Sequence, residues 1–206
     1  MDDNEVGLSA KSRRVPGVAA TASGRVILGI DPGTSVMGFG VIHVDQRAIR
    51  LLDAGAVRFR SDDDHTLKLR AIFRETMALI ERHLPDELAI EAQFFGKNVQ
   101  SMLKLGRAQG VAIAAAVQRD IAVVEYAPKR IKQSITGNGN ASKEQVAAML
   151  LNILRVSTLP TSTDATDAVA VAVCHHFAGS AITAAGGRAG GGGWAAFVRN
   201  NPDRLK

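Results

Sequence analysis

Three strand-length segments near the start of the chain constrain its fold more than any other feature. They are "RVILGID" (25–31), "VMGFGVIHV" (36–44) and "IRLLDAGAVRF" (49–59), and each is apolar or alternates apolar with polar residues. Only the short turn signals "PGTS" and "DQRA" separate them. This spacing predicts three neighbouring strands joined as an antiparallel meander.

Helices and strands then alternate along the chain. Apolar residues recur at helical spacing over 66–83, and Pro85 follows as a stop signal. The apolar run "ELAIEA" (87–92) precedes a long helical segment (99–118), and "IAVVEY" (121–126) is a further strand. Because parallel strands need such crossover helices, we expect an α/β fold with a five-stranded mixed sheet flanked by helices.

Two more helices are expected in the second half of the chain. Ser142 and Gln145 have the spacing of a capping box, which marks a helix start. The buried stripe of that helix is predicted to contain Val146, Met149, Leu150 and Ile153. A last helix is expected from about Thr163 to Phe177, and within it the only cysteine, Cys174, is expected to be a packed thiol.

The composition along the chain predicts one folded domain with two tails. Residues 1–24 show no helical or strand periodicity, which is typical of a flexible N-terminal arm. Seven of the twenty-eight residues in 179–206 are glycine, which indicates a disordered Gly-rich tail. The folded domain should therefore span 25–178, a length sufficient for one core.

Charge and hydropathy restrict the possible partners. No apolar stretch reaches 18 residues, so we expect a soluble, cytoplasmic protein with no membrane contact. The formal net charge is +5, and the segment from 95 to 145 alone carries eight basic against three acidic residues. A basic surplus confined to one segment favours an anionic partner such as nucleic acid.

Four carboxylates lie where such a fold would bring them together. Asp31 and Glu91 each end an apolar strand, and the carboxyl ends of adjacent parallel strands meet at one edge of a sheet. Asp164 and Asp167, three residues apart, share one face of the last helix. This pair alone has an ordinary alternative explanation, since acidic residues near the start of a helix can cap it and interact favourably with the positive end of the helix dipole.

A cluster of all four acids would require cations. Two carboxylates 4 Å apart repel by roughly 4 kcal/mol at an effective dielectric constant near 20. All-oxygen ligands select hard ions, so we expect Mg²⁺ or Mn²⁺, with two ions activating a water and stabilising a phosphodiester leaving group. His175 follows Asp167 by eight residues, about 12 Å along a helix, which is too far to share the metal.

The order and spacing of four motifs resemble the RuvC-type crossover junction endodeoxyribonucleases, which are Holliday junction resolvases. The motifs are "ILGIDPGTSVMGFGVI", "AIEAQFFGKN", "LKLGRAQGVAIAAAV" and "TDATDAVAVAV", and the resemblance covers about residues 25–178. It implies a ribonuclease H-like fold and a homodimer that makes paired, Mg²⁺-dependent nicks in four-way DNA junctions. The cleaved ends would be 5′-phosphate and 3′-hydroxyl, and a branch-migration helicase complex would be a partner.

The resemblance also implies roles for individual residues. The catalytic, metal-binding acids correspond to Asp31, Glu91, Asp164 and Asp167, and the basic residues near the scissile phosphate to Lys132 and Lys143. Phe94, with Phe95 beside it, matches the aromatic that inserts among bases, although a Phe-Phe pair is more often part of a core. Further candidates for DNA contacts are Lys97, Lys104 and Arg107. Many relatives have Gln directly after the strand-end Glu, whereas Ala92 intervenes here.

Two other classes of protein are compatible with parts of the sequence. "GIDPGT" (29–34) is similar to the first phosphate loop of actin-type and sugar-kinase ATP-binding proteins, but these need two related halves and a second phosphate loop. A junction-binding module without catalysis is the other alternative. Acidic residues at all four metal-ligand positions argue against it.

Overall fold

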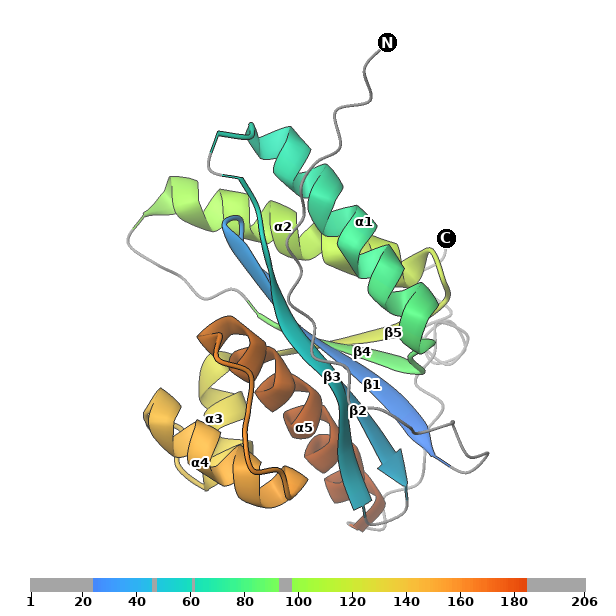
Figure 1. Ribbon diagram of the computed structural model, residues 1–206, viewed down its shortest axis with the longest axis vertical. Helices are drawn as coiled ribbons and strands as arrows, with labels where there is room; N and C mark the ends of the chain where they lie inside the picture. The colour runs from blue at the N-terminus through green and yellow to red at the C-terminus, as the bar shows by residue number, and fades with distance from the viewer. Residues whose placement is uncertain (1–23, 46–47, 61, 93–97, 185–206) are drawn as a thin grey trace, which may run out of the picture.

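Five strands form one mixed sheet in the computed structural model (Figure 1), which describes residues 24–45, 48–60, 62–92 and 98–184. The strands are β1 (Arg25–Asp31), β2 (Val36–Asp45), β3 (Ala48–Arg58), β4 (Glu87–Glu91) and β5 (Ala122–Tyr126), in the order β3-β2-β1-β4-β5. β1, β2 and β3 pair antiparallel, whereas the β1–β4 and β4–β5 pairs are parallel. The predicted meander and mixed sheet are confirmed, and the described residues form a single sheet rather than two related halves.

Helices cover both faces of this sheet. They are α1 (His65–His83), α2 (Val99–Val117), α3 (Pro128–Thr136), α4 (Lys143–Leu154) and α5 (Thr163–Ala184). α1 and α2 lie on one face, and α3, α4 and α5 lie on the other (Figure 1). In β1, Ile27 packs into the α5 layer while Leu28 packs into the opposite layer, and both are fully buried. Burial on both faces explains why β1 is an almost continuous apolar run.

Three local expectations differ from the structure. Met149 is 38% exposed, because the buried stripe of α4 runs through Val146, Leu150 and Leu154, and Met149 lies at its edge. The last helix does not end near Phe177 but continues to Ala184. α3 was not predicted: it is short and has only two buried apolar residues, although Pro128 at its first turn is a start signal.

Other local expectations are confirmed. α4 begins with the predicted capping box, in which Ser142 and Gln145 exchange side-chain and backbone hydrogen bonds. Cys174 is a free, buried cysteine, and burial raises the pKa of its thiol. No helix among the described residues is long and apolar enough to cross a membrane. Residues 1–23 of the predicted arm and 185–206 of the predicted tail lie outside the described residues.

Glycines in β1 and β2 bring α5 close to the sheet. A Cβ atom added at Gly29 would lie 2.2 Å from the carbonyl oxygen of Ala168, and one added at Gly38 would lie 2.0 Å from that of Asp164. Any larger residue at these positions would push the helix away. The absence of a side chain at Gly29 and at Gly38 therefore lets the first turns of α5 pack against the end of the sheet where β1 terminates.

Candidate active site

Asp31 and Glu91 lie side by side at the same edge of the sheet. β1 and β4 are adjacent and parallel, and Ile30 is paired with Ile90, so the residues that follow them end the two strands together. Side chains alternate between faces along a strand, and Gly29 faces α5, so Asp31 also faces α5. The predicted meeting of two strand-end carboxylates is confirmed in the structure.

Asp164 and Asp167 approach the same edge from α5. Gly38, which is paired with Asp31 across the β1–β2 ladder, is also the residue whose backbone touches Asp164. The side chain of Ser162 donates a hydrogen bond to Oδ2 of Asp164 at 3.1 Å. The start of α5 is thus fixed beside the end of β1, and its two aspartates are half-buried there.

The electrostatics show that these acids face one another. The pKa of Asp31 is raised from 3.8 to about 7, first by burial and then by the charges of Glu91, Asp167 and Asp164. The pKa of Glu91 is likewise raised, from 4.5 to about 7, by burial and by the charge of Asp167. Burial and like charge both disfavour ionisation. We call Asp31, Glu91, Asp164 and Asp167 the acidic cluster.

Two lysines border the acidic cluster. Lys143, the first residue of α4, places its Nζ 2.5 Å from Oδ2 of Asp167, and this hydrogen bond raises the pKa of the lysine. The capping box sets the direction in which α4 starts and so holds Lys143 toward α5. Lys132 on α3 is close enough that its charge lowers the pKa of Glu91. The family resemblance implied that both lysines lie near the scissile phosphate.

The chemistry of the donor set fits hard divalent cations. The cluster offers only carboxylate oxygens, which Mg²⁺ and Mn²⁺ prefer. Within the described residues, no three acidic, histidine or cysteine side chains are already arranged closely enough to enclose an ion. Like charges repel, and Lys143 already pairs with Asp167. The carboxylates are therefore the kind of ligand that these metals prefer, but in the structure they are spaced too widely to enclose an ion.

The structure describes only two of the remaining candidate residues, Lys104 and Arg107. Phe94, Phe95 and Lys97 lie outside the described residues. Lys104 and Arg107 are exposed on α2, and their charges lower the pKa of His65 on α1, after the larger effect of burial. They therefore lie on the α1 and α2 side of the sheet, away from Lys132 and Lys143.

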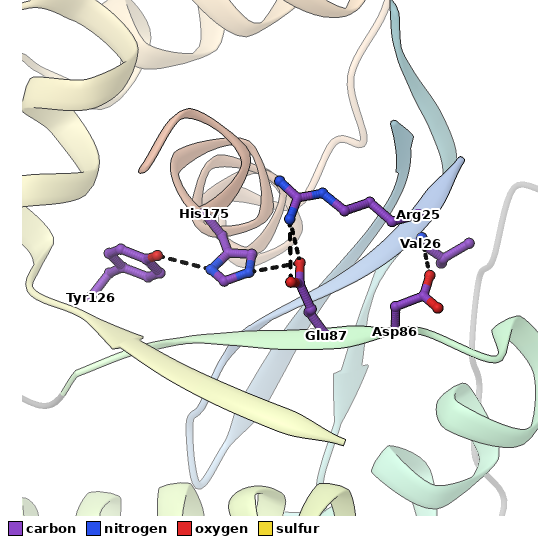
Figure 2. A network of polar contacts seen from close by, with 6 residues as sticks. All are labelled: Arg25, Val26, Asp86, Glu87, Tyr126 and His175. Carbon is purple, nitrogen blue, oxygen red and sulfur yellow. Dashed lines mark hydrogen bonds and ion pairs between the residues drawn. The ribbon is translucent and has the colours of Figure 1, made fainter. Parts of the chain in front are cut away.

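Sequence reasoning missed a chain of polar side chains that passes under α5 (Figure 2). The ring of His175 contacts the hydroxyl of Tyr126 through Nδ1 at 2.8 Å and the carboxylate of Glu87 through Nε2 at 3.0 Å. Arg25 also donates to Glu87. The available signal was a polar residue at a buried position of a helix that is otherwise apolar. The sequence analysis weighed His175 only as a metal ligand.

The sheet and its edge define a class. The sheet has the order β3-β2-β1-β4-β5, and two of its adjacent parallel strands end on carboxylates. Two further carboxylates face them from a helix that packs across the sheet. This is the arrangement of a ribonuclease H-like, metal-dependent nuclease. The sequence model of the family described as "Crossover junction endodeoxyribonuclease RuvC" matches residues 27–175. The chain belongs to the RuvC family.

Individual relatives agree with this assignment. The crossover junction endodeoxyribonuclease RuvC of Cytophaga hutchinsonii is 54% identical to this chain, and the match covers 88% of this chain and 88% of that protein. The RuvC of Porphyromonas gingivalis is 55% identical, and the match covers 88% of this chain and 97% of that protein. The structure of Thermus thermophilus RuvC in complex with Holliday junction substrate is similar with a TM-score of 0.73 and 32% identity. The similarity covers 77% of this chain and 97% of that one.

Proposed function

We propose that this protein is an endonuclease that resolves four-way DNA junctions by paired, metal-dependent hydrolysis, leaving 5′-phosphate and 3′-hydroxyl ends. The observation that carries the proposal is the acidic cluster, in which burial and mutual repulsion raise the pKa of both Asp31 and Glu91 to about 7. Perturbed carboxylates at the carboxyl ends of parallel strands are typical of catalytic sites. Four-way junction DNA is the substrate named for the Thermus thermophilus relative.

The acidic cluster would hold two Mg²⁺ ions, for which Mn²⁺ could substitute. Bound there, the ions would supply an activated water and neutralise charge on the reacting phosphate. Asp31 and Glu91 would bind from the rigid ends of β1 and β4, and Asp164 and Asp167 from the first turns of α5. The strands fix the first pair, and the close contact between Gly38 and α5 fixes the second pair relative to them.

Basic and aromatic residues would hold the DNA. Lys143 and Lys132 flank the acidic cluster, where an ammonium can contact the scissile phosphate. A pocket beside Asp167, lined by Lys143 and Thr163 among others, could admit the same strand. Phe94 and Phe95 would stack on bases at the crossover. Contacts to the backbone of the junction arms are assigned to Lys97, Lys104 and Arg107.

A homodimer would supply the second nick. α2 presents an exposed stripe at helical spacing, made of Val99, Leu103, Gly106, Gly110, Ala114 and Val117. A Cβ atom added at Gly106 or Gly110 would meet no atom of the described residues within 4 Å, so none of these residues covers this face. Small residues between apolar ends let a second helix approach closely. The same proposal includes a branch-migration helicase complex as partner and the cytoplasm as the location.

The proposal is tested by incubating the protein with a synthetic four-way junction and with a linear duplex of the same sequence, with and without Mg²⁺. We expect symmetric cleavage of the junction alone, and only with Mg²⁺. Asp31→Asn should abolish cleavage while binding the junction as tightly as the wild type does, because binding depends on basic residues. Asp120→Asn, an exposed change in the turn after α2, is the matched control and should cut normally.

Each contrary result has a defined meaning. Normal cutting by Asp31→Asn would show that the acidic cluster does not perform the chemistry. Tight junction binding by the wild type without cleavage in Mg²⁺ or Mn²⁺ would favour the binding module over the enzyme. Equal cleavage of the linear duplex would remove the selectivity for junctions from the proposal.

A further inference from the structure

Four side chains form one continuous polar network between α5 and the sheet, which we call the His175 network (Figure 2). Arg25 Nη1 lies 2.9 Å and 3.2 Å from the two carboxylate oxygens of Glu87. Glu87 Oε2 lies 3.0 Å from His175 Nε2, and His175 Nδ1 lies 2.8 Å from the hydroxyl oxygen of Tyr126. His175 is only 8% exposed, so its ring is removed from water.

The partners define the direction of the hydrogen bond to Glu87 and, for a neutral imidazole ring, that of the bond to Tyr126. Glu87 accepts from Arg25 and can only accept from the histidine, so Nε2 of His175 carries a proton. In the neutral ring Nδ1 is then the acceptor, and the hydroxyl of Tyr126 donates to it. Burial raises the pKa of Tyr126, which keeps this donor protonated. Both ring nitrogens are thus satisfied, and the ring has a single orientation.

The network connects the three elements that carry the acidic cluster. Glu87 is the first residue of β4, the strand that ends at Glu91. Tyr126 ends β5 directly opposite Glu91, and its carbonyl accepts a hydrogen bond of 2.9 Å from the backbone N–H of Ala92. His175 stands on α5, eight residues after Asp167. The ring therefore contacts the start of one acid-bearing strand and the residue paired with that strand's end.

Small apolar residues make much of the described contact between α5 and the sheet. Gly29 and Gly40 of the sheet lie against Ala168, Val169 and Ala172 of the helix, and all of these helix residues are fully buried. Apolar contacts between small residues are not directional, so they resist separation better than they resist sliding. Hydrogen bonds of fixed geometry do resist sliding. On this face, the His175 network ties the helix to β4 and β5 through directional contacts.

We propose that His175 is a positioning residue: by joining Tyr126 and Glu87 it fixes α5 relative to β4, and so sets the spacing between Asp167 and Glu91 at which divalent metal binds. The inference rests on the proposed metal site. Replacing a residue that orients a metal ligand without itself contacting the metal commonly changes the metal affinity. His175 itself would touch neither DNA nor metal.

The test measures the affinity of the full-length, DNA-free protein for Mn²⁺ by calorimetry. Tyr126→Phe removes one hydrogen bond and keeps the ring, and His175→Phe removes both hydrogen bonds of the histidine. We expect the affinity to fall roughly tenfold in Tyr126→Phe and further in His175→Phe. The double variant should match His175→Phe, because both changes break the same chain of contacts. Ile42→Val, which trims a buried side chain in the same layer outside the network, is the control.

Cleavage provides a second readout. The Mg²⁺ concentration for half-maximal cutting should rise in Tyr126→Phe, while kcat at saturating Mg²⁺ and junction binding in Ca²⁺ stay within about twofold of wild type. Unchanged Mn²⁺ affinity in Tyr126→Phe and His175→Phe, with a lowered melting temperature, would make the network merely structural and overturn the inference. An equal loss of Mn²⁺ affinity in Ile42→Val would also overturn the inference. If the wild type itself bound no Mn²⁺ or Mg²⁺, the proposed function and this inference would both fail.

Discussion

The ammonium of Lys143 lies 2.5 Å from the carboxylate of Asp167, so a cation supplied by the protein already neutralises one of the four clustered acids. Lys143 is the first residue of α4 and Asp167 lies in α5, 24 positions later in the chain. The lysine side chain remains 58% exposed, which leaves it free to turn toward another anion. A metal bound at Asp167 would therefore compete with Lys143, and the released ammonium would become available to a phosphate.

Replacement of this lysine should separate metal binding from cleavage. In Lys143→Met, the competing charge is absent, so we expect Mn²⁺ to bind the DNA-free protein several-fold more tightly. Cleavage of the junction under single-turnover conditions should nevertheless fall by roughly 10²-fold, the usual loss when one charge-stabilising donor is removed. Calorimetry and cleavage rates give the two readouts.

Lys143→Arg serves as the control because it keeps the positive charge and changes only the shape of the charged group. Metal affinity in this variant should stay near that of the wild type. Weaker Mn²⁺ binding in Lys143→Met would contradict the competition, and unchanged cleavage would exclude the phosphate contact.

The raised pKa values predict an unusual dependence of stability on pH. The pKa of Asp31 and of Glu91 is about 7 in the folded protein and near 4 in the unfolded chain. Between these values the folded state binds more protons, so the metal-free protein is stabilised at low pH and loses this stability as pH rises from about 4 through 7. A shift of about three units in one group corresponds to roughly 4 kcal/mol.

Melting curves in EDTA across pH 4 to 8 test this directly. Asp31→Asn cannot ionise, so at pH 8 it should melt on the order of 5–10 °C above the wild type, while the two proteins should melt together at pH 4. Saturating Mg²⁺ at pH 8 should stabilise the wild type far more than the variant. Parallel melting curves at all pH values would show that the pKa of Asp31 is not raised in the folded protein.

The fold and the two strand-end acids could be predicted because they depend on local patterns. Parallel strands whose apolar runs end on Asp31 and Glu91 must bring these residues to one edge, whatever the rest of the chain does. The same local reasoning failed for Met149, since helical periodicity gives the phase of a buried stripe but not its width.

Contacts between distant segments could not be predicted in the same way. Nothing local in α4 indicates that Lys143 meets Asp167, and the His175 network joins four residues from β1, β4, β5 and α5. Such pairs depend on how closely α5 approaches the sheet. The glycines at positions 29, 38 and 40 control that approach, and their role becomes visible only when the helix is in place.

If the exposed face of α2 forms the proposed dimer contact, a single glycine substitution should dissociate the dimer without harming the subunit. In Gly110→Glu the added Cβ atom meets none of the described atoms within 4 Å in one subunit, and glutamate is the better helix former by about 0.5–1 kcal/mol. Across a close helix pair, however, it would add bulk and a buried charge. Sedimentation at micromolar concentration should show a dimer for the wild type and a monomer of unchanged or higher melting temperature for the variant.

Ala148→Glu adds the same charge to an exposed position of α4 and should remain dimeric. Because paired nicks need two active sites, Gly110→Glu should also lose coordinated cutting of the junction. If Gly110→Glu remained dimeric, the dimer contact would lie elsewhere on the subunit. If the wild type were monomeric, the proposed dimer would be wrong.

Phe94 offers a test that separates stacking from packing. A base stacked on an aromatic ring contributes about 1–3 kcal/mol, so Phe94→Ala should slow junction resolution by roughly tenfold or more with an unchanged melting temperature. A core phenylalanine behaves differently, since its truncation costs about 3–5 kcal/mol of stability. A fluorescent base analogue at the crossover should report unstacking with the wild type and little with the variant. Phe95→Ala, one position along, shows whether the effect belongs to Phe94 or to both rings. Normal resolution together with a marked loss of stability would assign Phe94 to the core.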